Sequence, residues 1–228
     1  LGFDVLIDYP NHTGISDEKL KNVGDLMLPE GTKVKWEFAT KNTDAVSFRL
    51  ADSMIQLLPK GINSFEVENQ FFDNAGYSIA TQNEFTTGKD SINYYVTITK
   101  DNYPSIGVTE TMDSTNKLVH YYNGNVTDDY GFSKLNFNYK IITAEGKTRD
   151  SKSQSLTVSK TFNKEQFFHY FDLTTLGLNP GEKVEYYFQV WDNDGVNGAK
   201  SSKSRSQIYK APTLQEMAEN ADKANDEI

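Results

Sequence analysis

Residues 176–190 read LGLNPGEKVEYYFQV, and this stretch decides the fold class. Its second half places apolar side chains at every second position: Val184, Tyr186, Phe188 and Val190. The polar residues Glu185 and Gln189 fall between them, on the opposite face of an extended chain. The turn-forming residues Asn-Pro-Gly at 179–181 come directly before this run. The pattern predicts a β-strand that is entered from a tight turn and buries one face.

The same period of two recurs along the whole chain. In the first half it covers Phe3–Tyr9, Val34–Phe38, Val46–Leu50, Tyr77–Ala80 and Ile92–Ile98. In the second half it covers Leu118–Val126, Leu135–Ile142, Leu156–Thr161, Phe167–Leu173 and Gln207–Tyr209. Short strands at regular spacing, with no long helical period between them, favour β-sandwiches over an α/β fold.

The length and the turn signals predict two domains and a helix. A chain of 228 residues suits two sandwiches of roughly 100 residues each. Pro104 can neither continue a helix nor donate to a sheet, so we place the boundary between domains 1–101 and 102–211. Thr213 and Glu216 form a capping-box pattern, which predicts that an acidic helix starts within residues 212–228. The predicted fold class is all-β, with two tandem β-sandwiches followed by the start of a C-terminal α-helix.

The turn and strand at 176–190, together with Asp192 to Gly198, resemble the E to G strands of fibronectin type III and related immunoglobulin-like domains. The sequence departs from that pattern at one position, because Val184 stands where a corner tyrosine is usual. The resemblance implies that both sandwiches are immunoglobulin-like, and more narrowly fibronectin type III-like. It leaves open how the corner before this strand is closed.

Four motifs in order carry a second resemblance: YPNHTG at 9–14, LPEGT at 28–32, DDYGF at 128–132 and WDNDGVNG at 191–198. They are similar to those of a family of large, functionally uncharacterised Gram-negative envelope proteins, mainly from Bacteroidetes. Members have amino-terminal transmembrane helices, immunoglobulin-like domains and a long helical carboxy-terminal region. The resemblance implies a periplasmic or extracytoplasmic, membrane-anchored protein and supplies no catalytic residues. Since a strand pattern is already under way at Leu1, we expect a longer parent protein, with membrane segments outside this sequence.

Composition and motifs argue against several functions. With 23 Lys and Arg against 32 Asp and Glu, the chain carries a net charge of −9 and would repel nucleic acid. Its densest basic stretch, Lys200 to Lys210, is expected to be a solvated edge. There are no cysteines, and the 3 histidines lie in separate elements. With no phosphate-binding loop or nucleophile elbow either, we expect no enzyme activity.

Acidic turns are the one candidate cofactor site. In an immunoglobulin-like topology, two loops and the interdomain linker meet at one end of the second domain. They carry Asp101, Asp128, Asp129, Asp192 and Asp194. Crowded carboxylates repel one another unless a cation such as Ca²⁺ neutralises them, so the pattern allows a calcium site at the domain junction. The alternative is that each Asp accepts backbone hydrogen bonds within its own turn. No other cofactor is expected.

Two functions stay open at this point. The first is a structural or interaction module that spaces or binds protein partners in the cell envelope. The second is a carbohydrate- or glycan-binding module, for which the candidate aromatic residues are Trp36, Trp191, Tyr94, Tyr121 and Tyr187. A flat, exposed aromatic surface would support the second function, and burial of both tryptophans would rule it out.

Overall fold

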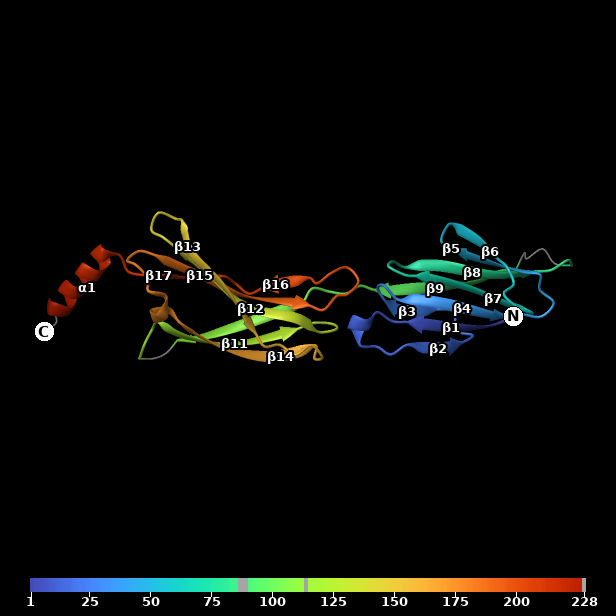
Figure 1. The fold of residues 1–228 in the computed structure, drawn as a ribbon, viewed down its shortest axis with the longest axis horizontal. Coiled ribbons are helices and arrows are strands. Elements are labelled where there is room, and N and C mark those ends of the chain that lie inside the picture. Colours follow the sequence, from blue (N-terminus) through green and yellow to red (C-terminus); the bar gives the residue numbers. More distant parts are fainter. Residues whose placement is uncertain (86–89, 113–114, 227–228) are drawn as a thin grey trace. The chain divides into compact units, whose positions relative to one another are not determined.

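The computed structural model describes residues 1–85, 90–112 and 115–226 of the chain. The chain divides into two compact units (Figure 1). The first contains Leu1–Asp101 and Gly195–Asn197, and the second contains Asn102–Asp194 and Gly198–Ile228. Each unit is an immunoglobulin-like β-sandwich with a hydrophobic core of its own.

The first unit consists of two sheets. One has the strand order β2-β1-β4-β7, formed by β1 (Gly2–Asp8), β2 (Glu18–Lys21), β4 (Lys33–Ala39) and β7 (Ser64–Gln70). The other has the order β3-β9-β8-β5-β6, formed by β3 (Leu26–Pro29), β5 (Ala45–Leu50), β6 (Ser53–Leu57), β8 (Ala75–Gln82) and β9 (Ile92–Thr99). The β3–β9 pair is parallel, whereas the other strand pairs given for this unit are antiparallel. A short 3-10 helix, η1 (Asn11–Thr13), follows β1.

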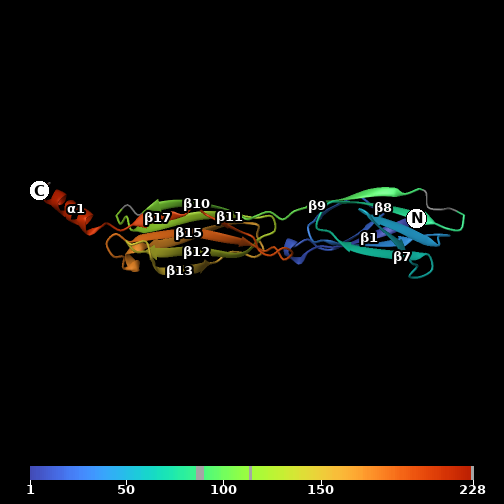
Figure 2. The ribbon, with the colours of Figure 1, turned by 90° about the horizontal axis from the view of Figure 1, so that it is seen from above.

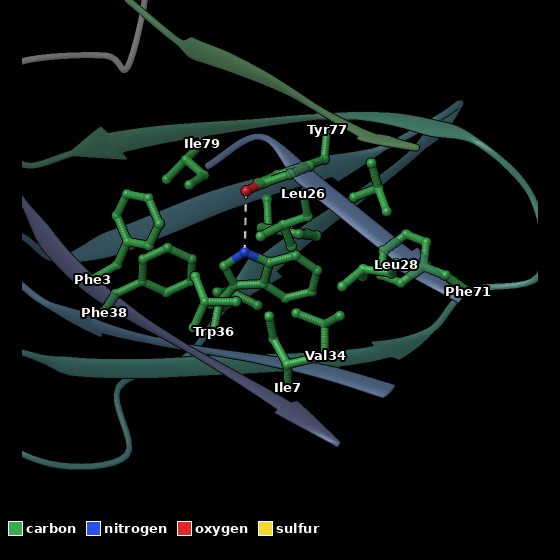
Figure 3. Close-up of a cluster of buried hydrophobic side chains, with 14 of the residues drawn as sticks. Phe3, Ile7, Leu26, Leu28, Val34, Trp36, Phe38, Phe71, Tyr77 and Ile79 are labelled. Atoms are coloured by element: carbon green, nitrogen blue, oxygen red, sulfur yellow. Dashed lines mark hydrogen bonds between the residues drawn. The ribbon is translucent and has the colours of Figure 1, made fainter. Parts of the chain in front are cut away.

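Trp36 lies at the centre of this core and is fully buried (Figure 3). Its indole Nε1 donates a hydrogen bond to Tyr77 Oη over 3.2 Å, and Tyr77 Oη donates to the carbonyl oxygen of Gly24 over 2.6 Å. Burial raises the pKa of the Tyr77 hydroxyl, so it stays a donor. Gly24 is required because a Cβ there would lie 2.0 Å from the ring of Tyr94. The polar atoms of these large side chains are thus satisfied inside the core.

The second unit pairs a three-stranded sheet with a larger one (Figure 2). The first has the order β10-β11-β14, formed by β10 (Ser105–Met112), β11 (Val119–Thr127) and β14 (Lys164–Asp172). The second has the order β13-β12-β15, formed by β12 (Phe132–Ile142), β13 (Thr148–Leu156) and β15 (Lys183–Asp192). The free side of β15 pairs with β16 (Ser201–Lys203) and then with β17 (Gln207–Lys210). This pairing order is that of a fibronectin type III-like sandwich.

The core of the second unit confirms the predicted orientation of β15. Val184, Tyr186, Phe188 and Val190 are all buried. The ring of Phe188 lies 4.9 Å from that of Phe137 and 5.2 Å from that of Phe167, centroid to centroid. On β11, Gly124 makes room for Phe167, because a Cβ there would lie 2.1 Å from that ring. The inward face of β14 therefore contributes Phe167 and Phe171 to the same core.

A buried carboxylate closes the corner before β15, in the role that a tyrosine hydroxyl has in related domains. The backbone N–H of Asn179 donates to Glu182 Oε2 over 2.8 Å, and Glu182 Oε1 lies 2.8 Å from Arg149 Nε. The hydrogen bond from Asn179 lowers the pKa of the Glu182 carboxyl, and the Arg149 guanidinium lowers it further. The corner bond that Val184 put in question is thus made by another residue type. The short 3-10 helix η2 (Leu173–Leu176) leads into this corner.

The strand expected at 156–161 is wrong. The strand in this region is β13, Thr148–Leu156, and eight of its nine residues are exposed. An edge strand with two solvated faces has no reason to alternate apolar and polar residues, so periodicity does not mark it. The sequence patterns also did not mark the strands β2, β6, β10 and β16, nor β3 and β7, which are partly buried.

The helix α1 (Leu214–Asp226) begins at the predicted capping box. The backbone N–H of Thr213 donates to Glu216 Oε2 over 2.7 Å, and that of Glu216 donates to Thr213 Oγ1 over 3.2 Å. Across the described ranges, no helix combines the length and the apolar character needed to cross a membrane.

Replacing Phe188 with Ala should lower the free energy of unfolding by roughly 3–5 kcal/mol, because it empties the space between Phe137 and Phe167. Phe168→Ala is the matched control. That side chain is exposed on β14, so its loss should change stability by less than about 0.5 kcal/mol. Urea denaturation of both variants checks the difference. Equal losses would mean that the assigned inward and outward faces are incorrect.

His169 should make the second unit less stable in acid. Its ring packs 4.3 Å from that of Phe137, and burial lowers its pKa to about 4. The unfolded chain therefore binds a proton that the folded chain does not, over the range from about pH 6.5 down to about pH 4. The free energy of unfolding should fall as the pH is lowered across that window, and His169→Phe should make its dependence on pH less steep. Urea denaturation of both proteins at pH 7 and pH 4.5 measures it, and identical slopes would contradict the assignment.

Candidate functional site

The outer face of the β10-β11-β14 sheet is the strongest candidate site in the second unit. The strand register arranges its outward residues in rows, of which three lie between the end rows Ser105–Thr127–Lys164 and Val119–Asp172. These three rows are Thr111–Tyr121–Tyr170, Thr109–Asn123–Phe168 and Gly107–Asn125–Gln166. Three aromatic side chains stand on this face, with exposed fractions of 74% for Phe168, 52% for Tyr170 and 46% for Tyr121. We call these nine positions the aromatic platform.

The rings of the aromatic platform are held by their neighbours. Tyr121 and Tyr170 are direct cross-strand partners with ring centroids 5.5 Å apart, and Tyr170 Oη donates to Asp172 Oδ2 over 3.3 Å. Phe168 lies on the same strand as Tyr170, on the diagonal from Tyr121. A Cβ at Gly107 would lie 2.7 Å from Asn125 Oδ1, so glycine there leaves space for that amide. The sheet therefore presents aromatic rings beside exposed amides on one rigid surface.

None of the nine platform positions is charged, although 24% of the chain is. The corresponding sheet of the first unit shows that this composition is not a property of the fold. Three of its rows are Asp4–Glu37–Glu66, Leu6–Lys35–Glu68 and Asp8–Lys33–Gln70, in which only Leu6 and Gln70 are uncharged, and the end row is Gly2–Ala39–Ser64. Lys35 Nζ lies 3.0 Å from Glu66 Oε2 on that face. Charged residues keep the outer face of the first unit solvated. The aromatic platform has no such charges.

Tyr121 is the one glycan-binding candidate from the sequence that lies on this platform. Trp36 is buried in the first core, and Tyr94 packs against that core, with its ring 5.4 Å from that of Tyr77. Trp191 and Tyr187 are partly buried and lie under ammonium groups, of Lys134 and Lys203, each 4.8 Å from the ring centroid. Of the five aromatic candidates, only Tyr121 therefore stands on the exposed face. The expectation that the other four are exposed binding residues was wrong.

Phe168 and Tyr170 were missed, although the sequence carried a signal for them. Residues 167–171 read FFHYF, five ring-bearing side chains in a row. A strand must send alternate members of such a run to opposite faces. Phe167 and Phe171 fill the core, so Phe168 and Tyr170 must face solvent. A run of this kind marks a strand that is apolar on both faces.

Asp192, the last residue of β15, and Asp194, just beyond it, are paired with a cation of the chain. Lys200 Nζ lies 3.0 Å from Asp192 Oδ2 and 2.7 Å from Asp194 Oδ2. Asp192 Oδ1 also accepts from the backbone N–H of Lys200 over 2.7 Å and from that of Asp194 over 3.3 Å. Both carboxylates are buried, and the Lys200 side chain is only 16% exposed. The expectation that Lys200 belongs to a solvated edge is therefore wrong.

Asp128 binds backbone amides of its own turn, whereas Asp129 binds Asn102, which lies 27 residues earlier in the chain. Asp128 Oδ2 accepts from the backbone N–H groups of Tyr130 and Gly131, each over 2.9 Å. Burial raises the pKa of the Asp128 carboxyl, and the negative charge of Asp192 adds to that shift. Asp129 Oδ2 accepts from Asn102, over 3.0 Å from its backbone N–H and 2.8 Å from its side-chain amide.

In the first unit, Asp101 Oδ2 lies 3.5 Å from His12 Nε2. The other two histidines have structural partners in the second unit: His120 hydrogen-bonds Glu110, and His169 packs in the core. A calcium site that joins Asp101, Asp128, Asp129, Asp192 and Asp194 stays a prediction. Within the second unit, calcium would have to compete with the ammonium group of Lys200.

Comparisons with known proteins support no family assignment. No protein-family model matches the chain, and no curated protein matches it either. Solved structures with some likeness include the fibronectin(III)-like modules of Clostridium thermocellum CbhA, which are 12% identical with a TM-score of 0.28. That match covers 92% of this chain and 95% of the other.

A candidate carbohydrate-binding protein from Bacteroides uniformis ATCC 8492 is 11% identical with a TM-score of 0.28, covering 76% of this chain and 90% of that one. A chicken TCR is 9% identical with a TM-score of 0.27, covering 80% and 98%. Likenesses this remote carry no argument about function. The immunoglobulin-like assignment is read from the strand pairing itself.

Lys200→Met should lower the free energy of unfolding by roughly 3–5 kcal/mol, because it removes the ammonium group from two buried carboxylates. Lys152→Met on the exposed strand β13 is the matched control, with an expected change below about 0.5 kcal/mol. Urea denaturation measures both variants.

A thermal melt of the wild type with calcium or with EDTA completes this test. If Lys200 supplies the counter-charge, the melting temperature should be the same in both solutions. A melting temperature that rises with calcium and falls with EDTA would instead support the five-aspartate site.

Proposed function

We propose that this chain is a non-enzymatic interaction module and that the aromatic platform of its second unit is the binding face. The observation that carries this proposal is the contrast between two corresponding sheets. The sheet of the first unit covers its outer face with ion pairs, whereas that of the second exposes Tyr121, Phe168 and Tyr170 among uncharged neighbours. Exposed aromatic rings in a region depleted of charge are typical of binding surfaces.

The titratable residues support a role without catalysis. Asp192 and Asp194 share the ammonium group of Lys200, and Glu182 closes a corner with Arg149. His169 lies in the core, where its lowered pKa follows from burial alone. These groups have structural roles, so none of them serves as a catalytic nucleophile or general base in this proposal.

We further propose that the module belongs to the soluble, periplasmic or extracytoplasmic part of a membrane-anchored envelope protein. The four ordered motifs at 9–14, 28–32, 128–132 and 191–198 support this location by their resemblance to such a family. In that setting the two sandwiches space or bind partners in the cell envelope. The net charge of −9 makes nucleic acid an unfavourable partner.

Site-specific photocrosslinking in the native host tests the binding face. A photoreactive phenylalanine analogue at Phe168 should form adducts on the living cell, and the same group at Glu68, on the charged face of the first unit, should not. Tyr121→Ala should reduce the adducts at position 168, because it removes part of the same surface. Equal adducts at both positions, or none at 168, would contradict the proposal.

A further inference from the structure

The rings of the aromatic platform suit a ligand whose units each have an apolar face. Tyr121 and Tyr170 are cross-strand neighbours whose ring planes are tilted by 51°, and Phe168 lies next along β14, so each ring offers its own face. Aromatic side chains have few rotatable bonds, so little conformational entropy is lost when a ligand stacks on them. The pyranose ring of a sugar presents such a face, because its C–H groups point to one side while its hydroxyls lie around the rim.

The amides of the platform suit the rim of such a ligand. Asn123 and Asn125 follow Tyr121 on the outward face of β11, and Gln166 is the cross-strand partner of Asn125. All three side chains are exposed. Each amide offers two N–H donors and one acceptor oxygen, and a hydroxyl group is also both donor and acceptor. Amides beside aromatic rings can thus bind the hydroxyls of a sugar whose ring stacks on the platform.

Charge decides between ligand classes. The nine platform positions hold no Lys or Arg, which acidic sugars or phosphate would need as partners. They hold no Asp or Glu for a cationic peptide either. The outward row of β14 reaches charged residues only beyond the platform, at Lys164 on one side and Asp172 on the other. An uncharged face in a chain with a net charge of −9 is electrostatically matched to a neutral ligand.

From these features we propose that the aromatic platform binds a neutral glycan, an inference that rests on the proposed function and names the ligand of that same face. The rings stack on the sugars, and the amides of Asn123, Asn125 and Gln166 hydrogen-bond their hydroxyls. An apolar protein surface fits less well, because the amides interrupt the aromatic area and would lose their water without a hydrogen-bond partner.

Affinity gel electrophoresis against soluble polysaccharides tests the ligand class. The neutral probes are mixed-linkage β-glucan, laminarin, xyloglucan, galactomannan, dextran and yeast mannan, and the acidic probe is polygalacturonate. At least one neutral probe should retard the wild type, and polygalacturonate should not. Tyr121→Ala and Phe168→Ala should each weaken that binding roughly tenfold or more, since each removes a stacking ring.

Tyr95→Ala is the matched control, because this tyrosine is 49% exposed on β9 of the first unit. It should bind like the wild type, and all three variants should keep the wild-type melting temperature. Binding to none of the neutral probes, or binding that survives both platform variants, would overturn the glycan proposal. If crosslinking at position 168 still depends on Tyr121 in that case, the binding face stands and its ligand is a protein. If both experiments are negative, both proposals fail.

Discussion

The pleat of strand β14 is the constraint on which both the core and the candidate site depend. Successive side chains of a strand point to opposite faces, so one ring-rich segment supplies two surfaces at once. Phe167 and Phe171 pack inward against the other sheet, while Phe168 and Tyr170 stand outward beside Tyr121. A shift of register by one residue would exchange these sets, burying the platform and exposing the core. The packing that stabilises the second unit therefore also holds the platform rings in place.

The two sandwiches show how little the fold alone says about binding. Both pair a sheet of related strand order against a second sheet, and both bury large aromatic side chains between the layers. The central rows of their outer faces differ, with charged residues on one and uncharged aromatic and amide residues on the other. Packing restricts the residues at inward positions, whereas residues at outward positions can vary. Differences in binding between domains of one fold therefore arise at outward positions. The proposed binding face therefore lies on the outward side of the second unit alone.

Asp192 and Asp194, at the end of β15 and just beyond it, show how buried carboxylates can be compensated by the chain itself. Two buried carboxylates need a compensating positive charge, and here the ammonium group of Lys200 supplies one. Lys200 is six residues from Asp194 and eight from Asp192, and it meets both because the loop folds back on itself. The loop conformation, more than the composition, sets which cation is within reach.

Local chemistry in the sequence was enough to determine the class of fold. Alternation marked the strands that bury one face, as in Val184 to Val190, and the Thr213–Glu216 pair marked the start of α1. Edge strands such as β13 gave no such signal, because neither of their faces is buried. Tyr121 was a candidate from the sequence, but its partners were not, since Phe168 and Tyr170 lie some fifty residues away along the chain. Only the register between β11 and β14 brings them together, and only the fold of the loop brings Lys200 to its two aspartates. Side-chain alternation is a local property that a sequence displays directly, whereas cross-strand neighbours and ion pairs depend on contacts that tertiary packing alone decides.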